Sequence, residues 1–333
     1  KIARRISMWC KPVEFTCEAN PESLTAELAA TLAEAGVTRI SLGVQTLDNT
    51  ELAAIGRIHD ANRALAAIAT VKDAGLDVSC DLMCGLPGQT AASWRSTLDG
   101  VLAAAPHHVS VYPLTLEEGT PLYRMACRDE SLEPDEDFQA SCMDAARERL
   151  GTAGYRPYEV ASYALDGHEC AHNIAYWTGR GYLGLGRSAA GMLDDEDFDR
   201  LAGLFPGVSS RGDAYRVRLV QRDDAATAFE AEYLSQREAV AEDLMLACRM
   251  TRGVDSDLLV RASRVIPADE LAAACDRALE LGLATWVPET LWGHEGPFTS
   301  ADVVAGHVRA RLAPTHLGWL DGNVLFELFW GLA

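Results

Sequence analysis

The 333-residue sequence lacks two features that identify common classes of protein. It has no run of 18 apolar residues, so we expect no helix that spans a membrane. It has no C-x-x-C pair, which argues against a paired-cysteine zinc site. Its nine cysteines follow no regular spacing, which in a chain of this length favours reduced thiols in the cytoplasm. Cys80 and Cys84 are the most closely spaced, and their apolar neighbours predict small buried side chains.

Basic residues are also scarce. The sequence has 29 Lys and Arg against 49 Asp and Glu, a formal net charge of −20. Because phosphate binding needs clustered Lys and Arg, we expect neither a nucleic-acid groove nor attachment to an anionic membrane. The chain begins at Lys1 instead of Met, and residues 1–5 resemble the end of a helix with no signal peptide after it. We therefore expect a fragment of a longer protein.

The first third of the sequence alternates short β-rich runs with alanine-rich stretches. A helix start signal lies at Asn20–Ser23, and Gly36 and Gly75 stand where helices end. This alternation predicts an α/β fold with a parallel sheet, but only about four β/α units fit before Leu114, so a full eight-stranded barrel is excluded. The expected strands are 14–18, 39–44, 78–83 and 109–114, and the expected helices are 23–35, 61–74 and 91–104.

The rest of the chain becomes mainly helical. Several short helices with a small β-ribbon indicate a winged-helix-like module, and we place a boundary near residues 200–225, between domains at 1–200 and 225–333. The expected elements are helices at 134–150, 236–250, 256–262, 268–281 and 323–332, strands at 155–163 and 216–221 (the latter at a sheet edge), and a solvated acidic loop at 193–200.

Polar residues stand near the ends of the expected strands, where β/α sheets carry their chemistry. They are Glu18, Gln45 and Asp81, with Arg57 following the helix after Gln45. Carboxylates can accept from ribose hydroxyls or an ammonium group, and Arg can pair with a carboxylate, so the set suits a zwitterionic ligand with a ribose. Taken singly, each residue fits a helix cap or a surface ion pair better. The turn before Thr90 predicts a capped helix start and not a phosphate-binding loop.

The hexapeptide H-N-I-A-Y-W begins at His172 and is followed by a glycine-rich run, which predicts a loop or short helix. A neutral imidazole can ligate iron, and the flat rings of Tyr176 and Trp177 can pack on a flat macrocycle. The alternative is a packed aromatic cluster with one hydrogen-bonded histidine. His168, four residues upstream, is a competing ligand.

Blocks of sequence along essentially the whole chain resemble, in order, the HemW-type proteins. These are the oxygen-independent coproporphyrinogen III oxidase-like members of the radical S-adenosylmethionine superfamily, described as heme chaperones. The resemblance is carried by CEANPESL, GVTRISLGVQTLD, GRIHDANRA, DLMCGLPGQTAASW, HVSVYPLTLEEGTPL, YEVASYALDGHECAHNIAYWTGRGYLGLG, AEDLMLACRMTRGVD and LAPTHLGWLDGNVLFELF. It implies the back half of a partial, TIM-barrel-like (β/α) radical S-adenosylmethionine barrel, followed by a mainly helical C-terminal domain.

The resemblance also implies a role for each residue of the two sets above. Glu18, Gln45, Arg57 and Asp81 match residues that contact S-adenosylmethionine in the related oxidases. His172 matches a histidine implicated in heme binding, and we expect it to ligate the heme iron, with Tyr176 and Trp177 lining the pocket. The intact protein is then expected to bind heme, S-adenosylmethionine and a [4Fe–4S] cluster and to pass heme to acceptor proteins, with a homodimer as one option.

Two departures from the family pattern bear on this expectation. The sequence contains no C-x-x-x-C-x-x-C loop, so the three thiolates that hold a [4Fe–4S] cluster are missing from it. It also reads G-L-G-R-S-A-A-G where the family usually has G-L-G-A-G-A-H-S. Arg187 therefore replaces the usual alanine, and Ala190 replaces the usual histidine. Two alternatives therefore stay open: a coproporphyrinogen III oxidase, or a binding module without a cluster.

Overall fold

The chain separates into two compact units, Lys1–Ala171 and His172–Ala333. The computed structural model describes residue 5 and residues 12–289 and 297–333. The expectation that residues 1–5 end a helix therefore lies, apart from Arg5, outside the described residues. The division between the units comes before the 200–225 region in which the sequence predicts a boundary, and the two predicted domains stay a prediction.

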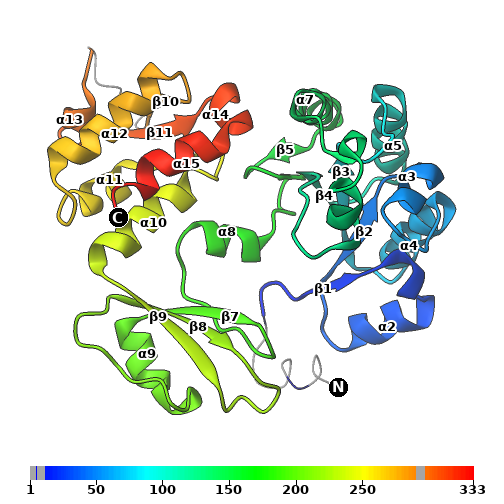
Figure 1. Ribbon diagram of the computed structural model, residues 1–333, viewed down its shortest axis with the longest axis horizontal. Coiled ribbons are helices and arrows are strands. Elements are labelled where there is room, and N and C mark those ends of the chain that lie inside the picture. Colours follow the sequence, from blue (N-terminus) through cyan, green and yellow to red (C-terminus); the bar gives the residue numbers. More distant parts are fainter. Residues whose placement is uncertain (1–4, 6–11, 290–296) are drawn as a thin grey trace. The chain divides into compact units, whose positions relative to one another are not determined.

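The first unit is built on a six-stranded sheet with the strand order β1-β2-β3-β4-β6-β5. Its first four strands are parallel, and helices α2 to α5 lie along them in blue and cyan in Figure 1. The predicted parallel sheet of about four β/α units is thereby confirmed. The strands are β1 (Thr16–Ala19), β2 (Arg39–Gln45), β3 (Asp77–Cys84) and β4 (His108–Pro113), and the helices are α2 (Ala26–Glu34), α3 (Asn49–Ala54), α4 (Ala61–Asp73) and α5 (Ala91–Ala104).

The helix boundaries follow local capping. The first helix begins later than predicted, because Pro21–Ser23 forms a separate 3-10 turn and Thr25 is the N-cap that accepts from the Leu28 amide. Gly36 and Gly75 follow the ends of α2 and α4 with φ of 91° and 72°, as predicted for residues that stop a helix. Thr90 caps α5 through a reciprocal bond with Ser93, which confirms the predicted helix start.

Alternation along the strands gives the sheet two unlike faces. Ile40, Leu42 and Val44 of β2 are fully buried, as are Cys80 and Cys84 of β3, which confirms the prediction for these two cysteines. The intervening residues are polar or small and form the opposite face. Because side chains of a strand alternate between faces, this one pattern sets both the apolar contact with the helices and the polar surface.

The segment predicted as one strand over 155–163 forms two short strands instead. They are β5 (Arg156–Pro157) and β6 (Ser162–Ala164), and β6 pairs antiparallel with both β5 and β4. The chain turns between them, with the Tyr158 amide donating to the Ser162 carbonyl at 3.2 Å. Antiparallel neighbours need only a short turn, whereas a parallel strand would need a long crossover. Before this hairpin come α6 (Pro121–Ala126), η2 (Glu130–Leu132) and α7 (Glu136–Thr152).

The second unit opens with α8 (Ala171–Trp177) and a three-stranded antiparallel sheet. Its strands are β7 (Ala190–Asp194), β8 (Arg216–Gln221) and β9 (Phe229–Leu234). The predicted edge strand, β8, is the central one, because the sequence signals of β7 and β9 were missed. The predicted acidic loop is also wrong: α9 (Asp195–Leu201) forms there, followed by the short turn η3 (Ala202–Leu204). Acidic residues suit a helix N-terminus, and Phe198 packs in the core with Val217.

The remaining helices and a two-stranded ribbon form the predicted winged-helix-like arrangement. Val254 additionally bridges to Leu312, so the ribbon extends toward the start of α11. The elements are α10 (Gln236–Ala247), α11 (Ser256–Ala262), α12 (Ala268–Glu280), β10 (Ala284–Pro288), α13 (Ser300–Val304), β11 (Ala310–Pro314), α14 (His316–Leu320) and α15 (Gly322–Trp330).

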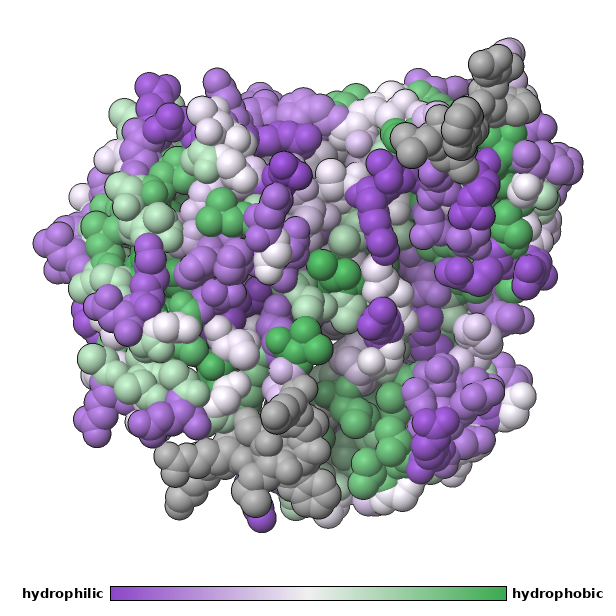
Figure 2. All heavy atoms as spheres, turned by 180° about the vertical axis from the view of Figure 1, so that it is seen from behind, coloured by the Kyte–Doolittle hydropathy of each residue, from purple (hydrophilic) through white to green (hydrophobic). Residues whose placement is uncertain are grey.

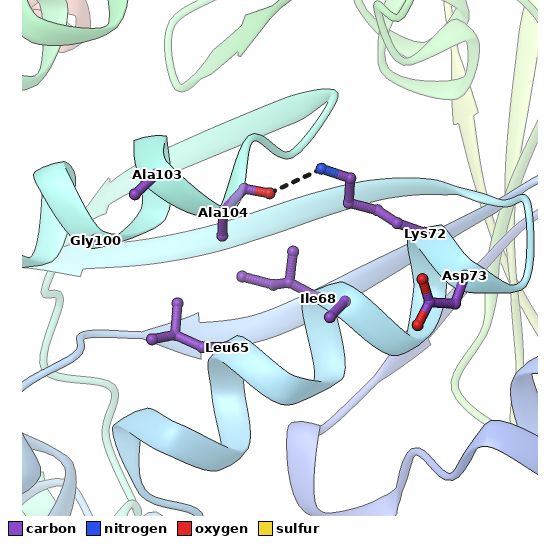
Figure 3. Close-up of a pocket in the computed structure, with 8 residues that line it drawn as sticks. Leu65, Ile68, Lys72, Asp73, Gly100, Ala103 and Ala104 are labelled. Carbon is purple, nitrogen blue, oxygen red and sulfur yellow. Dashed lines mark hydrogen bonds between the residues drawn. The ribbon is translucent and has the colours of Figure 1, made fainter.

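An apolar groove of about 430 Å³ runs between α4 and α5 (Figure 3). Leu65 and Ile68 line one side, and the small residues Gly100 and Ala103 leave space on the other. Lys72 closes one end by donating to the Ala104 carbonyl at 3.0 Å. The groove belongs to the helical side of the sheet and brings no group suited to acid–base or metal chemistry toward the polar face.

Among the described residues, no helix combines the length and apolarity needed to cross a membrane. Hydrophilic side chains cover most of the face seen in Figure 2, with hydrophobic ones in groups between them.

Candidate functional site

Two carboxylates face the polar side of the first sheet. Glu18 of β1 is paired in register with Ser41 of β2, and Asp81 of β3 is paired with Ser110 of β4. Ser41 Oγ donates to Asp81 Oδ2 at 3.0 Å, which links the two strands. Burial raises the pKa of Asp81 to about 6, partly offset by hydrogen bonds from Ser41 and Ser110, and the negative charge of Glu18 raises it further. The two carboxylates therefore act on one another across this face.

Three other polar side chains meet over Gly43 of β2. A Cβ added at Gly43 would lie 3.0 Å from Gln45 Nε2, 3.7 Å from Asn20 Oδ1 and 4.0 Å from Arg57 Nη1. Arg57 Nη1 donates to Asn20 Oδ1 at 3.0 Å. Gln45, the last residue of β2, is buried and has a φ of 66°, a left-handed conformation that costs energy in a residue other than glycine. Gly43 thus leaves room for an amide, a guanidinium and a second amide to converge.

The sequence-predicted set is thus distributed over the polar face of one sheet and the loop that carries Arg57. Glu18 and Gln45 lie at or near strand ends as predicted, but Asp81 is the fifth of eight residues in β3, so its position at a strand end is wrong. The sequence reasoning also missed Asn20 and Ser41. The signal for Ser41 is the strict alternation along β2, in which every second residue is apolar.

Asp81→Asn tests how burial acts on this carboxyl. Because the folded pKa of about 6 lies above the unfolded 3.8, folding stability falls as pH rises between these values, and the cost is complete above pH 6. We expect Asp81→Asn to stabilise the protein by about 3 kcal/mol at pH 7.5 and by less than about 1 kcal/mol near pH 4. Urea unfolding of both proteins at the two pH values measures this, with exposed Asp73→Asn as the control. An equal difference at both pH values would contradict the assigned cause.

The hexapeptide lies on α8, a short helix, as one of the two predicted conformations. His172 and Tyr176 are one helical turn apart, and both are exposed, Tyr176 by 36%. The His172 and Tyr176 ring centroids are 6.2 Å apart, and those of Tyr176 and Trp177 are 5.6 Å apart. Tyr182, which the sequence did not point to, lies with its ring centroid 4.7 Å from that of Tyr176, tilted by 34°, and donates its hydroxyl to the Tyr176 oxygen at 2.8 Å. An exposed imidazole therefore stands beside a row of aromatic rings.

The chain leaves α8 through Gly179, which packs closely against Asp243 of α10. Gly179 has a φ of 67°, and a Cβ added to it would overlap Asp243 Oδ1. Asp243 is in turn held by Arg216, whose Nη2 donates to both carboxylate oxygens at 2.9 and 3.1 Å, while its Nη1 donates to Glu242 Oε2 at 3.1 Å. A largely buried, hydrogen-bonded ion pair of this kind fixes one geometry. The exit of α8 therefore packs against a fixed carboxylate of α10.

Arg249 contacts the aromatic side of the same helix. Its guanidinium carbon lies 5.1 Å from the Trp177 ring centroid and 4.4 Å from that of Phe326 in α15. A guanidinium at these distances from two ring faces contributes a cation–π attraction.

The two departures from the family pattern, Arg187 and Ala190, are both exposed, with Ala190 as the first residue of β7.

The described residues do not assemble a cysteine cluster. Within residues 12–289 and 297–333 one group of three potential metal-ligating side chains comes together, and it contains no cysteine: Asp77, His107 and His168. None of the described cysteines forms a disulfide bond, and most of them are buried.

Known proteins similar to this chain belong to one superfamily. A model of the radical SAM superfamily matches residues 2–101. The mitochondrial "Radical S-adenosyl methionine domain-containing protein 1" of Bos taurus is 41% identical over 181 residues, 54% of this chain and 41% of that protein. The "Heme chaperone HemW" of Lactococcus lactis is 33% identical over 242 residues, 72% of this chain and 61% of that protein. The chain spans about half the length of the curated relatives it matches.

The fold is similar to that of a solved enzyme. The coproporphyrinogen III oxidase of Escherichia coli, described as a radical SAM enzyme, aligns with a TM-score of 0.70 over 98% of this chain and 73% of that one, at 18% identity. This confirms the predicted fold class, a partial barrel followed by a helical domain. Further proteins named heme chaperone HemW, from Mycobacterium tuberculosis and Bacillus subtilis, are 38% and 30% identical. The chain is therefore similar to proteins of the HemW-type group, and its first third matches the radical SAM superfamily.

Proposed function

We propose that this chain is part of a heme chaperone that holds heme at α8 and passes it to acceptor proteins. The observation that carries the proposal is the exposed imidazole of His172 beside the rings of Tyr176 and Trp177. The chain's similarity to proteins named heme chaperones supports it. Those protein partners, a cytoplasmic location and a homodimer are parts of this proposal.

The exposure of α8 suits delivery better than permanent storage. A neutral imidazole supplies the nitrogen that ligates heme iron, and neighbouring rings add contact with the macrocycle. None of the residues of α8 is buried, so an acceptor protein can reach a heme held there.

We also propose that S-adenosylmethionine binds on the polar face of the first sheet. The donor set fits the ligand: Glu18 and Asp81 offer carboxylates to ribose hydroxyls or the ammonium group, and Arg57 offers a guanidinium to the carboxylate. Gln45 adds an amide that can donate or accept, in a backbone conformation held by the end of β2. The [4Fe–4S] cluster belongs to the proposed intact protein, where it would supply the electron that cleaves bound S-adenosylmethionine.

The alternative function is oxidative decarboxylation of coproporphyrinogen III by a 5′-deoxyadenosyl radical. The fold similarity to an oxidase favours it, but at 18% identity this similarity supports the fold alone. The H-N-I-A-Y-W hexapeptide favours the chaperone, because it presents an iron ligand that decarboxylation does not use. Two parallel incubations of the intact protein under anaerobic conditions separate the functions: one with hemin, and one with coproporphyrinogen III, S-adenosylmethionine, a reductant and an electron acceptor. We expect stoichiometric heme binding and transfer in the first and no protoporphyrinogen in the second, whereas rapid product formation in the second would favour the oxidase.

Arg57→Ala should weaken binding of S-adenosylmethionine to this chain by about tenfold, because one charge-assisted pairing with the ligand carboxylate is lost. Equilibrium dialysis with labelled ligand measures the change. Arg95→Ala, which removes an exposed arginine from α5 without touching the polar face, serves as the control. Equal affinity of the Arg57 and Arg95 variants would remove Arg57 from the proposed site.

A further inference from the structure

A second cluster of polar side chains lies where the parallel strands β3 and β4 of the first sheet begin. Asp77 is the first residue of β3, His107 directly precedes β4, and His168 lies in the segment after β6. Gln45, by contrast, lies at the carboxyl end of β2. We propose that Asp77, His107 and His168 form a binding site for a divalent transition metal ion such as Zn²⁺. The proposal does not rest on the proposed heme or S-adenosylmethionine sites.

Both imidazoles face the same carboxylate. His168 Nδ1 lies 2.9 Å from Asp77 Oδ2, and His107 Nδ1 lies 3.8 Å from Asp77 Oδ1. The two rings are tilted by 30° with centroids 4.7 Å apart, and one ligand atom from each of the three residues falls within 4.8 Å of the others. Ligands of a tetrahedral zinc ion lie ~3.4 Å from one another. Because all three side chains are half-buried and none is fully enclosed, small rotations bring them to that spacing.

The backbone holds the three positions together before any ion binds. The His107 amide donates to the Val78 carbonyl at 2.9 Å, and the Leu165 amide donates to the His107 carbonyl at 3.1 Å. The His168 amide then donates to the Leu165 carbonyl at 3.0 Å. Two neighbouring strands and the segment after β6 are thus connected by hydrogen bonds at the level of the cluster. A site on such a scaffold loses little freedom when it binds an ion.

The donor chemistry selects the class of ion. Two imidazole nitrogens and one carboxylate suit Zn²⁺, Co²⁺ or Ni²⁺, whereas Mg²⁺ and Ca²⁺ prefer oxygen alone. The Val78 amide donates to His107 Nδ1 at 3.1 Å, which shows a lone pair on this nitrogen. Ion binding there replaces this hydrogen bond, so we expect moderate affinity with water completing the coordination.

The test uses Co²⁺ as a spectroscopic probe on the metal-free, reduced 333-residue chain. We expect one equivalent of Co²⁺ to bind with visible d–d bands and without the near-ultraviolet thiolate band that cysteine ligands would produce. His168→Gln and Asp77→Asn should each weaken this binding by about tenfold or more, whereas His168→Cys, which restores a ligand, should retain it with a new thiolate band.

His307→Ala is the matched control, because His307 is an exposed histidine in the other unit. Circular dichroism confirms that each variant is folded before titration. The proposal is overturned if His168→Gln and Asp77→Asn bind Co²⁺ as tightly as the unmodified chain, or if His307→Ala loses as much affinity as they do. A thiolate band in the unmodified chain would also overturn it, by assigning the ion to cysteines.

Discussion

His172→Ala is expected to weaken heme binding by at least tenfold, about 1.4 kcal/mol, and to shift the Soret band. The reason is that an axial histidine contributes an iron–nitrogen bond, whereas a stacked aromatic ring contributes only about 1 kcal/mol. His172 is exposed at the start of α8, so its removal leaves no cavity and should not unfold the protein. Titration of the chain with hemin, followed in the Soret region, measures both the affinity and the spectral change.

Two further variants separate ligation from packing. Tyr176→Phe keeps the ring that lies 6.2 Å from His172 and removes only the hydroxyl that accepts from Tyr182, so we expect an affinity change below about threefold. His168→Ala should leave the Soret band unchanged, because His168 Nδ1 lies beside Asp77. If His172→Ala behaves as the unmodified chain does, the hexapeptide is an aromatic packing motif. If His168→Ala alone shifts the band, His168 is the ligand.

The strands of the first sheet could be predicted because the alternation of apolar with polar or small residues in their sequence shows which side chains are buried. In β2, apolar Ile40, Leu42 and Val44 alternate with polar or small residues, and this period of two holds only where one face packs against helices. The helix ends at Gly36 and Gly75 were equally readable, since a left-handed φ favours glycine. Local chemistry alone decides such features.

Other features depended on partners distant in sequence. The acidic run that forms α9 resembles a loop in sequence. It forms a helix because Phe198 packs against Phe205 and Val217, which are distant in sequence or outside the run. The position of β8 at the centre of its sheet depends on two strands whose signals are weak. Pairing and tertiary packing override local composition in both cases.

The candidate site shows the same division. Resemblance and strand position pointed to Gln45 and Arg57, but their meeting over Gly43, together with Asn20, is a consequence of sheet register and of the bulge between Leu42 and Gln45. The Asp77–His107–His168 cluster joins residues up to 91 positions apart. Helix and strand periodicity relate only residues within one element, so they could not predict this cluster. Spacing finds ligands on one helix or one loop; only the fold brings together those on separate strands.

The 333-residue chain by itself is expected to assemble no [4Fe–4S] cluster and to release no 5′-deoxyadenosine. Such a cluster needs thiolates, and burial disfavours the thiolate at several described cysteines: it raises the pKa of Cys84 and of Cys275 to about 12, and that of Cys142 to about 11. Cys80 and Cys248 are also fully buried, and burial raises their pKa still further. An iron ion would have to open the core to reach these groups, at the cost of the packing around them.

Anaerobic reconstitution with iron and sulfide tests this directly. We expect less than about 0.3 tightly bound iron per chain after desalting, no absorption shoulder near 400 nm, and no 5′-deoxyadenosine after addition of dithionite and S-adenosylmethionine. Cys84→Ser is the matched control: it removes one of the two most closely spaced cysteines, so nonspecific iron should not depend on it. Four irons per chain, lost in Cys84→Ser, would mean that the core opens to hold a cluster. The cysteines of this chain would then be the cluster ligands, and the prediction would be wrong.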